Sequence, residues 1–298
     1  MEKQKIYYMV CSSPRSGSSL LCNLLENTGI AGKKNFENVN AALLSENWKT
    51  GGDLKDFFKE LFYVSETDNG VSGFKVHWIH MENLAVKNHQ VLSNKDLAKL
   101  LPTGLKYIFI TRRDVIKQAV SLEKAKQTHI FRETKNKSGI EKDFKAEFCF
   151  FKIERYISII NYFNKGWEKY FKDNNIKPLE IVYEDLTKDF RGNIVKTLEY
   201  LGVDVPNDLN IKTDLIKQSN DINDKWILEY NNSSVFKKIF FAKTFKFLGE
   251  MYGIFYKLRQ SSVLYRKFFD FMRIKIQLLS SFKRNNGTRK NMRRDAGI

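Results

Sequence analysis

The sequence predicts an α/β protein with a mainly parallel central sheet that is flanked by helices. Apolar runs typical of strands alternate along the chain with longer segments whose apolar residues recur at helical spacing. The clearest run, "KYIFIT" at residues 106–111, is continuously apolar and is followed by two arginines. With 298 residues and a hydrophobic fraction of 42%, the chain can bury a sizeable core.

The first strand and the first helix come soon after the N-terminus. "KIYYMVCS" (residues 5–12) reads as a buried strand, and "SSLLCNLLENTG" (18–29) follows as a helix that Gly29 is placed to end. The segments that come next are predicted as a helix over 53–64, a turn over 66–70 and a strand over 70–79.

After the strand at 106–111, Asp114 is placed as the N-cap of a helix over 114–131. The segments beyond it are predicted as a long amphipathic helix over 141–174, a strand and turn over 178–186, and a helix over 193–202 that Gly202 ends. Beyond about Asn232 the pattern is helical only, basic and rich in Phe and Tyr. We therefore expect a principal domain at 1–232 and a basic, aromatic-rich helical extension at 233–298.

The positive charge of the chain is concentrated in this extension. The net charge is +17, and residues 235–298 hold 16 Lys and Arg against three acidic residues, which is +13 of that total. Three scattered cysteines, Cys11, Cys22 and Cys149, favour neither a disulfide framework nor a zinc site. No run of about 18 apolar residues predicts a membrane span, and the N-terminal apolar run is too short for a signal peptide. We therefore expect a cytoplasmic protein.

The loop between the first strand and the first helix, "SSPRSGSS" (residues 12–19), has the composition of an anion site. Its backbone N–H groups can converge on a phosphate at the helix N-terminus, and Gly17 permits the tight turn. Arg15 adds a guanidinium, and the hydroxyl groups of Ser16, Ser18 and Ser19 add donors. The Lys-Ser/Thr ending of an ATP-binding P-loop is missing. The alternative is an ordinary strand-to-helix turn.

A second anion site is predicted at "RRDVIKQAVS" (residues 112–121), directly after the strand at 106–111. Arg112 and Arg113 follow the carboxyl end of a strand, where α/β sheets bind their ligands. Ser121 lies about two helical turns after Asp114 and so faces the same side as the helix start. The alternative is a capping aspartate beside two solvated arginines.

These two segments resemble those of sulfotransferases that use 3′-phosphoadenosine 5′-phosphosulfate. The similarity is closer to the bacterial carbohydrate sulfotransferases of the trehalose 2-sulfotransferase type. It continues, in family order over about residues 6–230, through "TGIAG", "GFKVHW", "GWEKYF", "VYEDL" and "KQSNDINDKW". Of the segments beyond the first loop, only "TGIAG" and "RRDVIKQAVSLEKAKQTHIF" are individually specific, and the ordered series is much stronger than any one of them.

The resemblance implies roles for the residues of both segments. The first loop would hold the 5′-phosphosulfate, with Arg15 stabilising the leaving phosphate, and an arginine with Ser121 would hold the 3′-phosphate. Spacing favours Arg112 for this role and leaves Arg113 open. Tyr183 matches the position that approaches the adenine, or else it is a core tyrosine. The resemblance implies no metal, and the product would be adenosine 3′,5′-bisphosphate.

The resemblance also implies a general base for the acceptor hydroxyl group, and two candidates stay open. In the trehalose-type enzymes a glutamate shortly after the "TG-x-AG" segment has this role, but here an ungapped alignment places Phe36 at that position. Glu37, displaced by one residue, is the first candidate. His77 is the second, because imidazole titrates near neutral pH. Lys75 would contact the phosphosulfate or the acceptor, or else it is a strand-edge lysine.

The resemblance implies a carbohydrate or glycolipid acceptor, and it includes dimeric enzymes, so a homodimer is a further expectation. It does not cover the basic extension, which suits an anionic membrane surface on the inner face of the membrane. The alternatives are packing onto the catalytic domain, gathering of an anionic glycolipid acceptor and, least favoured, binding of nucleic acid. Two rival functions for the whole chain are a P-loop kinase and a non-catalytic membrane- or RNA-binding protein on a sulfotransferase fold.

Overall fold

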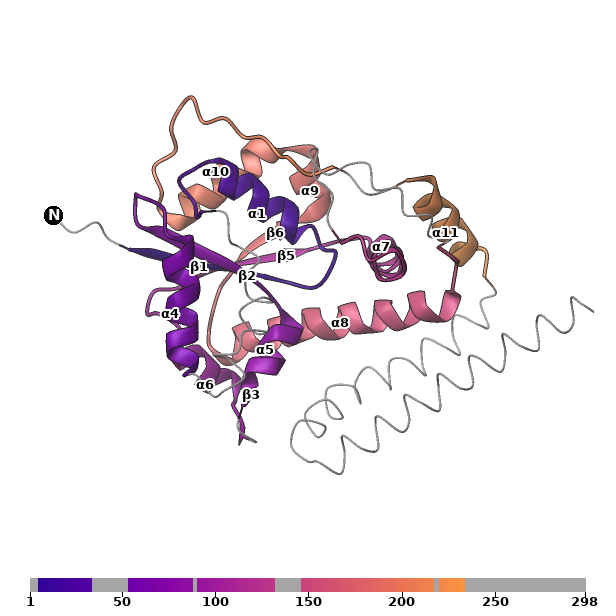
Figure 1. The fold of residues 1–298 in the computed structure, drawn as a ribbon, viewed down its shortest axis with the longest axis horizontal. Helices are drawn as coiled ribbons and strands as arrows, with labels where there is room; N and C mark the ends of the chain where they lie inside the picture. Colours follow the sequence, from indigo (N-terminus) through magenta and orange to yellow (C-terminus); the bar gives the residue numbers. More distant parts are fainter. Residues whose placement is uncertain (1–4, 34–52, 88–89, 132–145, 217–219, 234–298) are drawn as a thin grey trace, which may run out of the picture.

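The structure is a computed structural model that describes residues 5–33, 53–87, 90–131, 146–216 and 220–233. Helices cover both faces of a central sheet (Figure 1). The sheet has four strands in the order β2-β1-β5-β6, and all of its pairs are parallel. The predicted fold class is therefore confirmed. The strands of this sheet are β1 (Ile6–Ser12), β2 (Val71–His77), β5 (Lys106–Thr111) and β6 (Leu179–Val182).

In the described residues, each strand of the main sheet is followed by at least one helix before the next strand of that sheet. The helices of these residues are α1 (Ser18–Asn27), α4 (Leu54–Ser65), α5 (Trp78–Ala85), α6 (Asn94–Lys99), α7 (Val115–Thr128), α8 (Phe150–Asp173), α9 (Tyr183–Lys188), α10 (Phe190–Leu201) and α11 (Asp221–Asn231). A short antiparallel pair, β3 (Val86–Lys87) and β4 (Gln90–Val91), lies apart from the main sheet.

The two faces of the sheet bury separate hydrophobic cores. Met9 and Cys11 of β1 face a core that is shared with α4, α5, α6 and α8. Tyr8 and Val10, the residues that alternate with them, face a core that is shared with α1, α9 and α10. Because β1 is covered on both faces, its sequence is continuously apolar rather than alternating.

A third, smaller core joins α7, α8 and α11 beside the sheet (Figure 1). Phe150 of α8 stacks on Tyr230 of α11 with ring centroids 5.3 Å apart. This packing holds α7, and with it the segment after β5, against the rest of the protein.

Several predicted boundaries were wrong. The second strand ends at His77, since Trp78 begins α5, and the predicted turn after β6 is the helix α9. The long helix, predicted over 141–174, begins at Phe150, and the described residues just before it, 146–149, are not helical. Helix α11 was not predicted. Asp114, by contrast, is confirmed as an N-cap, because its side chain accepts a hydrogen bond from the backbone N–H of Lys117.

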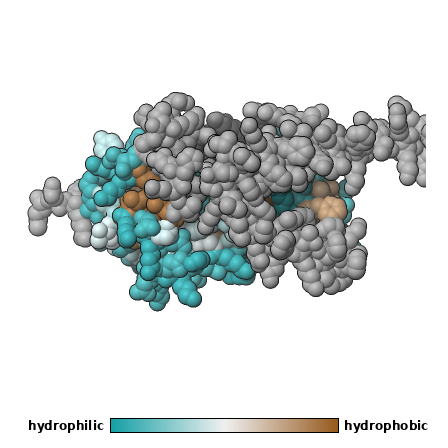
Figure 2. Space-filling view, turned by 90° about the horizontal axis from the view of Figure 1, so that it is seen from below, coloured by the Kyte–Doolittle hydropathy of each residue, from teal (hydrophilic) through white to brown (hydrophobic). Residues whose placement is uncertain are grey.

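The predicted C-terminal extension lies outside the described residues, so its structure stays a prediction. The surface seen in Figure 2 is mostly hydrophilic where the described residues are visible, with smaller hydrophobic areas. No helix in the described ranges is both long and apolar enough to cross a membrane.

Candidate functional site

The candidate site lies where β1, β5 and β6 end. These strands are parallel and adjacent, so their carboxyl ends lie at one edge of the sheet. The loop 13–17, the segment 112–114 and Tyr183 follow these three ends. Helices α1 and α7 begin at the same edge, and the N-termini of helices favour negative charge.

Gly17 occupies a position that no other residue fits. Its φ is 92°, in the left-handed region that side chains rarely adopt. A Cβ atom at this position would lie 2.3 Å from the Tyr183 ring. The loop therefore needs glycine both for its turn and for the close approach of Tyr183.

The serines of the loop have different surroundings. Ser16 is buried, and within the described part of the chain its Oγ has no hydrogen-bond partner. Ser18 is also buried, while Ser19 Oγ accepts a hydrogen bond of 3.1 Å from Lys75 Nζ. A buried hydroxyl group without a partner is costly, so Ser16 is a group that a bound anion would satisfy.

Arg15 connects the two predicted anion sites. Its φ of 63° is left-handed, and its Nε donates a hydrogen bond of 3.0 Å to Ser121 Oγ on α7. Its guanidinium also donates to the carbonyl oxygen of Phe131. Burial lowers the pKa of Arg15, the charge of Arg112 lowers it further, and Tyr183 opposes the shift. Two guanidinium groups thus lie near enough to repel each other.

Arg112 and Arg113 lie in contrasting environments. The guanidinium carbon of Arg112 is 4.7 Å from the centroid of the Tyr183 ring, and the side chain is only 15% exposed. Arg113 instead pairs with Asp185 at 2.6 Å, with 59% of its side chain exposed. The structure therefore brings Arg112 together with Gly17, Tyr183 and Arg15, and it directs Arg113 to the surface.

Glu184, which the sequence reasoning missed, fixes the segment that holds these arginines. Its carboxylate accepts hydrogen bonds from the backbone N–H groups of Arg113 (3.0 Å) and Asp114 (3.2 Å). One carboxylate oxygen also lies 3.8 Å from Arg112 Nε. Its place beside Tyr183 in the "VYEDL" motif was the available signal.

Lys75 and His77 lie on β2, next to the loop. The buried Lys75 reaches Ser19, as described above, and His77 Nδ1 lies 2.9 Å from Ser12 Oγ. His80 Nδ1 accepts a hydrogen bond of 3.3 Å from the His77 backbone N–H. Burial and, secondarily, the charge of Lys75 lower the pKa of His80 to about 4. His80 is therefore neutral at ordinary pH.

Glu37, the first candidate for the general base, lies outside the described residues. Gln118, a second residue that sequence reasoning missed, is fully buried on α7 and donates to Ser13 Oγ and to the carbonyl oxygen of Pro14. Its position one helical turn before Ser121 could have indicated it. No three His, Cys, Asp or Glu residues in the described ranges cluster as metal ligands, which leaves the prediction of metal-free chemistry untested.

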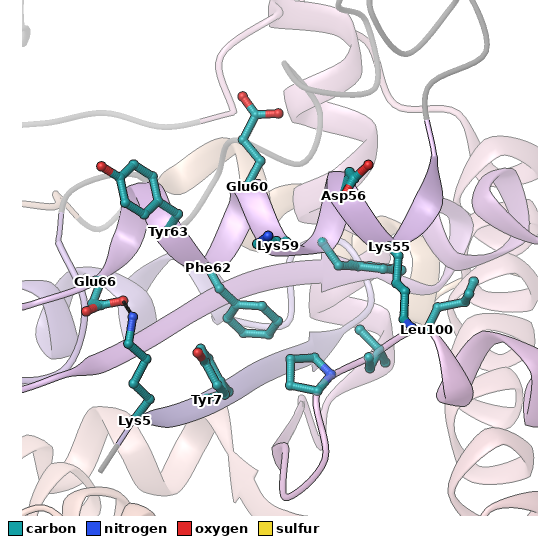
Figure 3. A pocket seen from close by; sticks show the side chains of 13 residues that line it. Lys5, Tyr7, Lys55, Asp56, Lys59, Glu60, Phe62, Tyr63, Glu66 and Leu100 are labelled. Carbon is teal, nitrogen blue, oxygen red and sulfur yellow. Dashed lines mark hydrogen bonds and ion pairs between the residues drawn. The ribbon is translucent and has the colours of Figure 1, made fainter. Parts of the chain in front are cut away.

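An open groove of about 770 Å³ lies away from this site, beside α4 and the start of β1 (Figure 3). Lys5 and Glu66 form an ion pair at its edge, and Tyr63 and Lys59 also line it. Among the described residues, none of the predicted site residues lines this groove. The predicted site residues that the structure describes lie at or near the carboxyl ends of the strands instead.

Comparison with known proteins gives matches of three kinds: a family model, relatives by sequence and a solved structure. Residues 7–233 match the family model described as Stf0 sulphotransferase. The trehalose 2-sulfotransferase of Mycolicibacterium smegmatis is 27% identical over 76% of this chain and 95% of its own length. The enzyme of that name from Mycobacterium tuberculosis is 24% identical over 75% of this chain and 93% of its own length. The sulfotransferase domain of the Synechococcus PCC 7002 olefin synthase aligns with a TM-score of 0.42 at 15% identity, covering 82% of this chain and 96% of that domain.

Proposed function

Since the chain belongs to the Stf0 sulphotransferase family and is therefore a sulfotransferase, we propose that it transfers a sulfuryl group from 3′-phosphoadenosine 5′-phosphosulfate to a hydroxyl group of a carbohydrate. The observation that supports the donor is the convergence of three segments at one edge of the sheet. Gly17, Tyr183 and Arg112 are in contact there, and Arg15 is hydrogen-bonded to Ser121.

The residues present fit a donor with two phosphate groups. The repulsion between Arg15 and Arg112 would be relieved by negative charge between them. Donors at the loop would come from the N-terminus of α1 and from Ser16 Oγ, which has no hydrogen-bond partner in the part of the chain that the structure describes. Arg112 with Ser121 would hold the 3′-phosphate, and the Tyr183 ring, which already packs on Gly17 and Arg112, would approach the adenine.

When bound, the donor supplies an activated sulfuryl group whose departure leaves negative charge on the 5′-phosphate. Arg15 and the N–H groups of the loop would stabilise that charge, because they are fixed before the reaction begins. Lys75 lies close enough to the loop, through Ser19, to contact the phosphosulfate or the acceptor.

We propose either Glu37 or His77 as the general base, and one pair of variants distinguishes between them. Glu37 rests on the resemblance, while His77 is supported by its place at the end of β2 and by its contact with Ser12. Replacing the base, by Glu37→Gln or by His77→Gln, should lower kcat about 100-fold or more and leave the affinity for adenosine 3′,5′-bisphosphate unchanged. A variant with wild-type kcat would remove that residue from the mechanism.

Calorimetric titration with adenosine 3′,5′-bisphosphate, with MgATP as the control, tests the donor site. We expect the bisphosphate to bind and MgATP not to bind, whereas a preference for MgATP would favour the kinase alternative. Transfer of radiolabelled sulfate from the donor to trehalose, and to glycolipids that contain it, then tests the acceptor. Binding of the bisphosphate without transfer to any carbohydrate would favour a non-catalytic protein.

We propose further that residues 233–298 form a separate extension that brings a cytoplasmic enzyme to the inner face of the membrane. The net charge of +13 over residues 235–298, interleaved with aromatic residues, supports this. Full-length protein should sediment with anionic vesicles, and protein without residues 235–298 should not. Equal sedimentation of the two forms would contradict the proposal, and zwitterionic vesicles are the control for lipid charge.

A further inference from the structure

We propose that Gln118, on α7, is a positioning residue. It would hold the loop 13–17, which is proposed to bind the phosphosulfate, in its binding conformation. The same helix carries Ser121, which is proposed to bind the 3′-phosphate. This inference rests on the proposed function. Gln118 does not need to touch the donor, because it would act through the backbone of the loop. Its side chain is fully buried on α7, three residues before Ser121.

Both N–H groups of the Gln118 amide are directed at the loop. Nε2 donates to the Pro14 carbonyl oxygen at 2.7 Å and to Ser13 Oγ at 3.0 Å. The orientation of the amide is fixed, because a flipped amide would bring its oxygen against the Pro14 carbonyl oxygen, which can only accept. These contacts span 104 and 105 residues of sequence, so they join two otherwise separate segments.

The amide oxygen of Gln118 is buried and has no hydrogen-bond partner in the described residues. Leaving a buried acceptor unsatisfied is unfavourable, and a purely apolar side chain at this position would avoid it. A role in packing alone therefore does not explain a glutamine here. The contacts made by its N–H groups do.

The contact with Pro14 sets the direction of the peptide group that it shares with Arg15. A trans peptide is planar, and its C=O and N–H point in opposite directions. Holding the Pro14 carbonyl oxygen toward α7 therefore turns the Arg15 N–H away from α7. It also fixes the backbone at Arg15, whose left-handed φ of 63° is an unfavourable conformation for a residue with a side chain.

The two links between the loop and α7 are one helical turn apart. Gln118 holds the loop backbone, and Ser121 accepts from the Arg15 side chain at 3.0 Å. If Gln118 is replaced, the Pro14–Arg15 peptide is free to rotate, and the Arg15 N–H group loses its fixed direction. The Gln118 amide donates to Ser13 and Pro14 and not to Ser121 or Arg112. The 5′ end of the donor should therefore be affected more than the 3′ end.

The test uses Gln118→Met, which keeps the length of the side chain but donates no hydrogen bond. Its affinities for three probes are measured by calorimetry on the full chain. The probes are adenosine 3′,5′-bisphosphate, adenosine 5′-phosphosulfate without a 3′-phosphate, and adenosine 3′-monophosphate. We expect the two probes with a 5′ group to bind 10- to 100-fold more weakly, and the 3′-monophosphate to change less than threefold.

Gln127→Met is the matched control. Gln127 also lies on α7, and its amide also donates twice, to Glu123 and to the carbonyl oxygen of Glu147. This variant should bind all three probes as the wild type does. Equal weakening of all three probes by Gln118→Met, or no weakening, would overturn the proposal.

Gln118→Glu provides a second measurement if the methionine variant does not fold. The deprotonated carboxylate of this variant cannot donate a hydrogen bond to the Pro14 carbonyl oxygen, whereas the protonated carboxyl group can. Relative to the wild type at each pH, its affinity for the 5′-phosphosulfate probe should recover as the pH falls. A constant ratio would contradict a role through hydrogen bonding. If the wild type binds none of the probes, the proposed function itself fails, and this inference fails with it.

Discussion

At the scale of single residues, two adjacent arginines of one motif have opposite surroundings. Arg112 lies against the Tyr183 ring beside the loop, while Arg113 pairs with Asp185 at the surface. Arg112→Ala should therefore weaken the binding of adenosine 3′,5′-bisphosphate by about 10- to 100-fold, since a charge-assisted contact to phosphate contributes about 1.5–3 kcal/mol. Calorimetry on the purified variant measures this.

Arg113→Ala is the matched control for that prediction. An exposed ion pair contributes about 0–1 kcal/mol, so its removal should change the affinity less than about fivefold. Adenosine 5′-phosphosulfate, which lacks the 3′-phosphate, should bind both variants nearly equally. A larger loss for Arg113→Ala than for Arg112→Ala would reverse the assignment.

The sequence singled out candidate residues but not the contacts among them. Composition and position marked the serine-rich loop, Gly17 and the paired arginines as candidates, and their roles stay predictions. It did not distinguish Arg112 from Arg113, because the difference comes from Tyr183 and Asp185, about 70 residues further along the chain. The contact of Gly17 with Tyr183 spans more than twice that distance. Such contacts depend on strand order, which a single sequence does not contain.

At the scale of elements, the strands were the easiest to predict and the ends of helices the hardest. β1 and β5 are continuously apolar because helices cover both faces of the sheet. Helix α11 was missed because its segment is mostly polar. Only Trp226 and Tyr230 among its bulky residues are buried, and they pack on α7 and α8. Its helical state is a consequence of that packing more than of its own sequence pattern.

The packing of α11 on α8 includes a buried hydrogen bond that can be tested. The Tyr230 hydroxyl group donates to Glu154 Oε1 at 2.5 Å, and both residues are at most 6% exposed. Tyr230→Phe removes the donor and leaves a buried carboxylate with one partner fewer. The free energy of unfolding should fall by about 1–3 kcal/mol, as measured by urea denaturation.

Tyr63→Phe is the control for this substitution. Tyr63 is 77% exposed on α4, so the same change of chemistry should leave stability within about 0.5 kcal/mol of the wild type. If Tyr230→Phe also has no effect, the hydrogen bond between Tyr230 and Glu154 does not contribute to stability.

At the scale of the whole molecule, β2 and α5 bring candidate site residues close to a buried histidine whose ionisation affects stability. Lys75, His77 and His80 lie within one short stretch, and His80 is only 7% exposed. Burial and the charge of Lys75 hold the pKa of His80 at about 4, below the ordinary value of 6.5. The folded protein thus excludes a proton that the unfolded chain accepts as the pH falls below about 6.5.

The stability of the protein should therefore decrease between pH 6.5 and pH 4, because protonation of His80 favours the unfolded state throughout that range. A shift of this size contributes of the order of 3 kcal/mol over the whole interval. His80→Asn removes the titrating group and keeps an acceptor for the His77 backbone N–H. Urea denaturation at several pH values should show a shallower decrease for this variant than for the wild type. Parallel curves for wild type and His80→Asn would show that His80 is not protonated on unfolding.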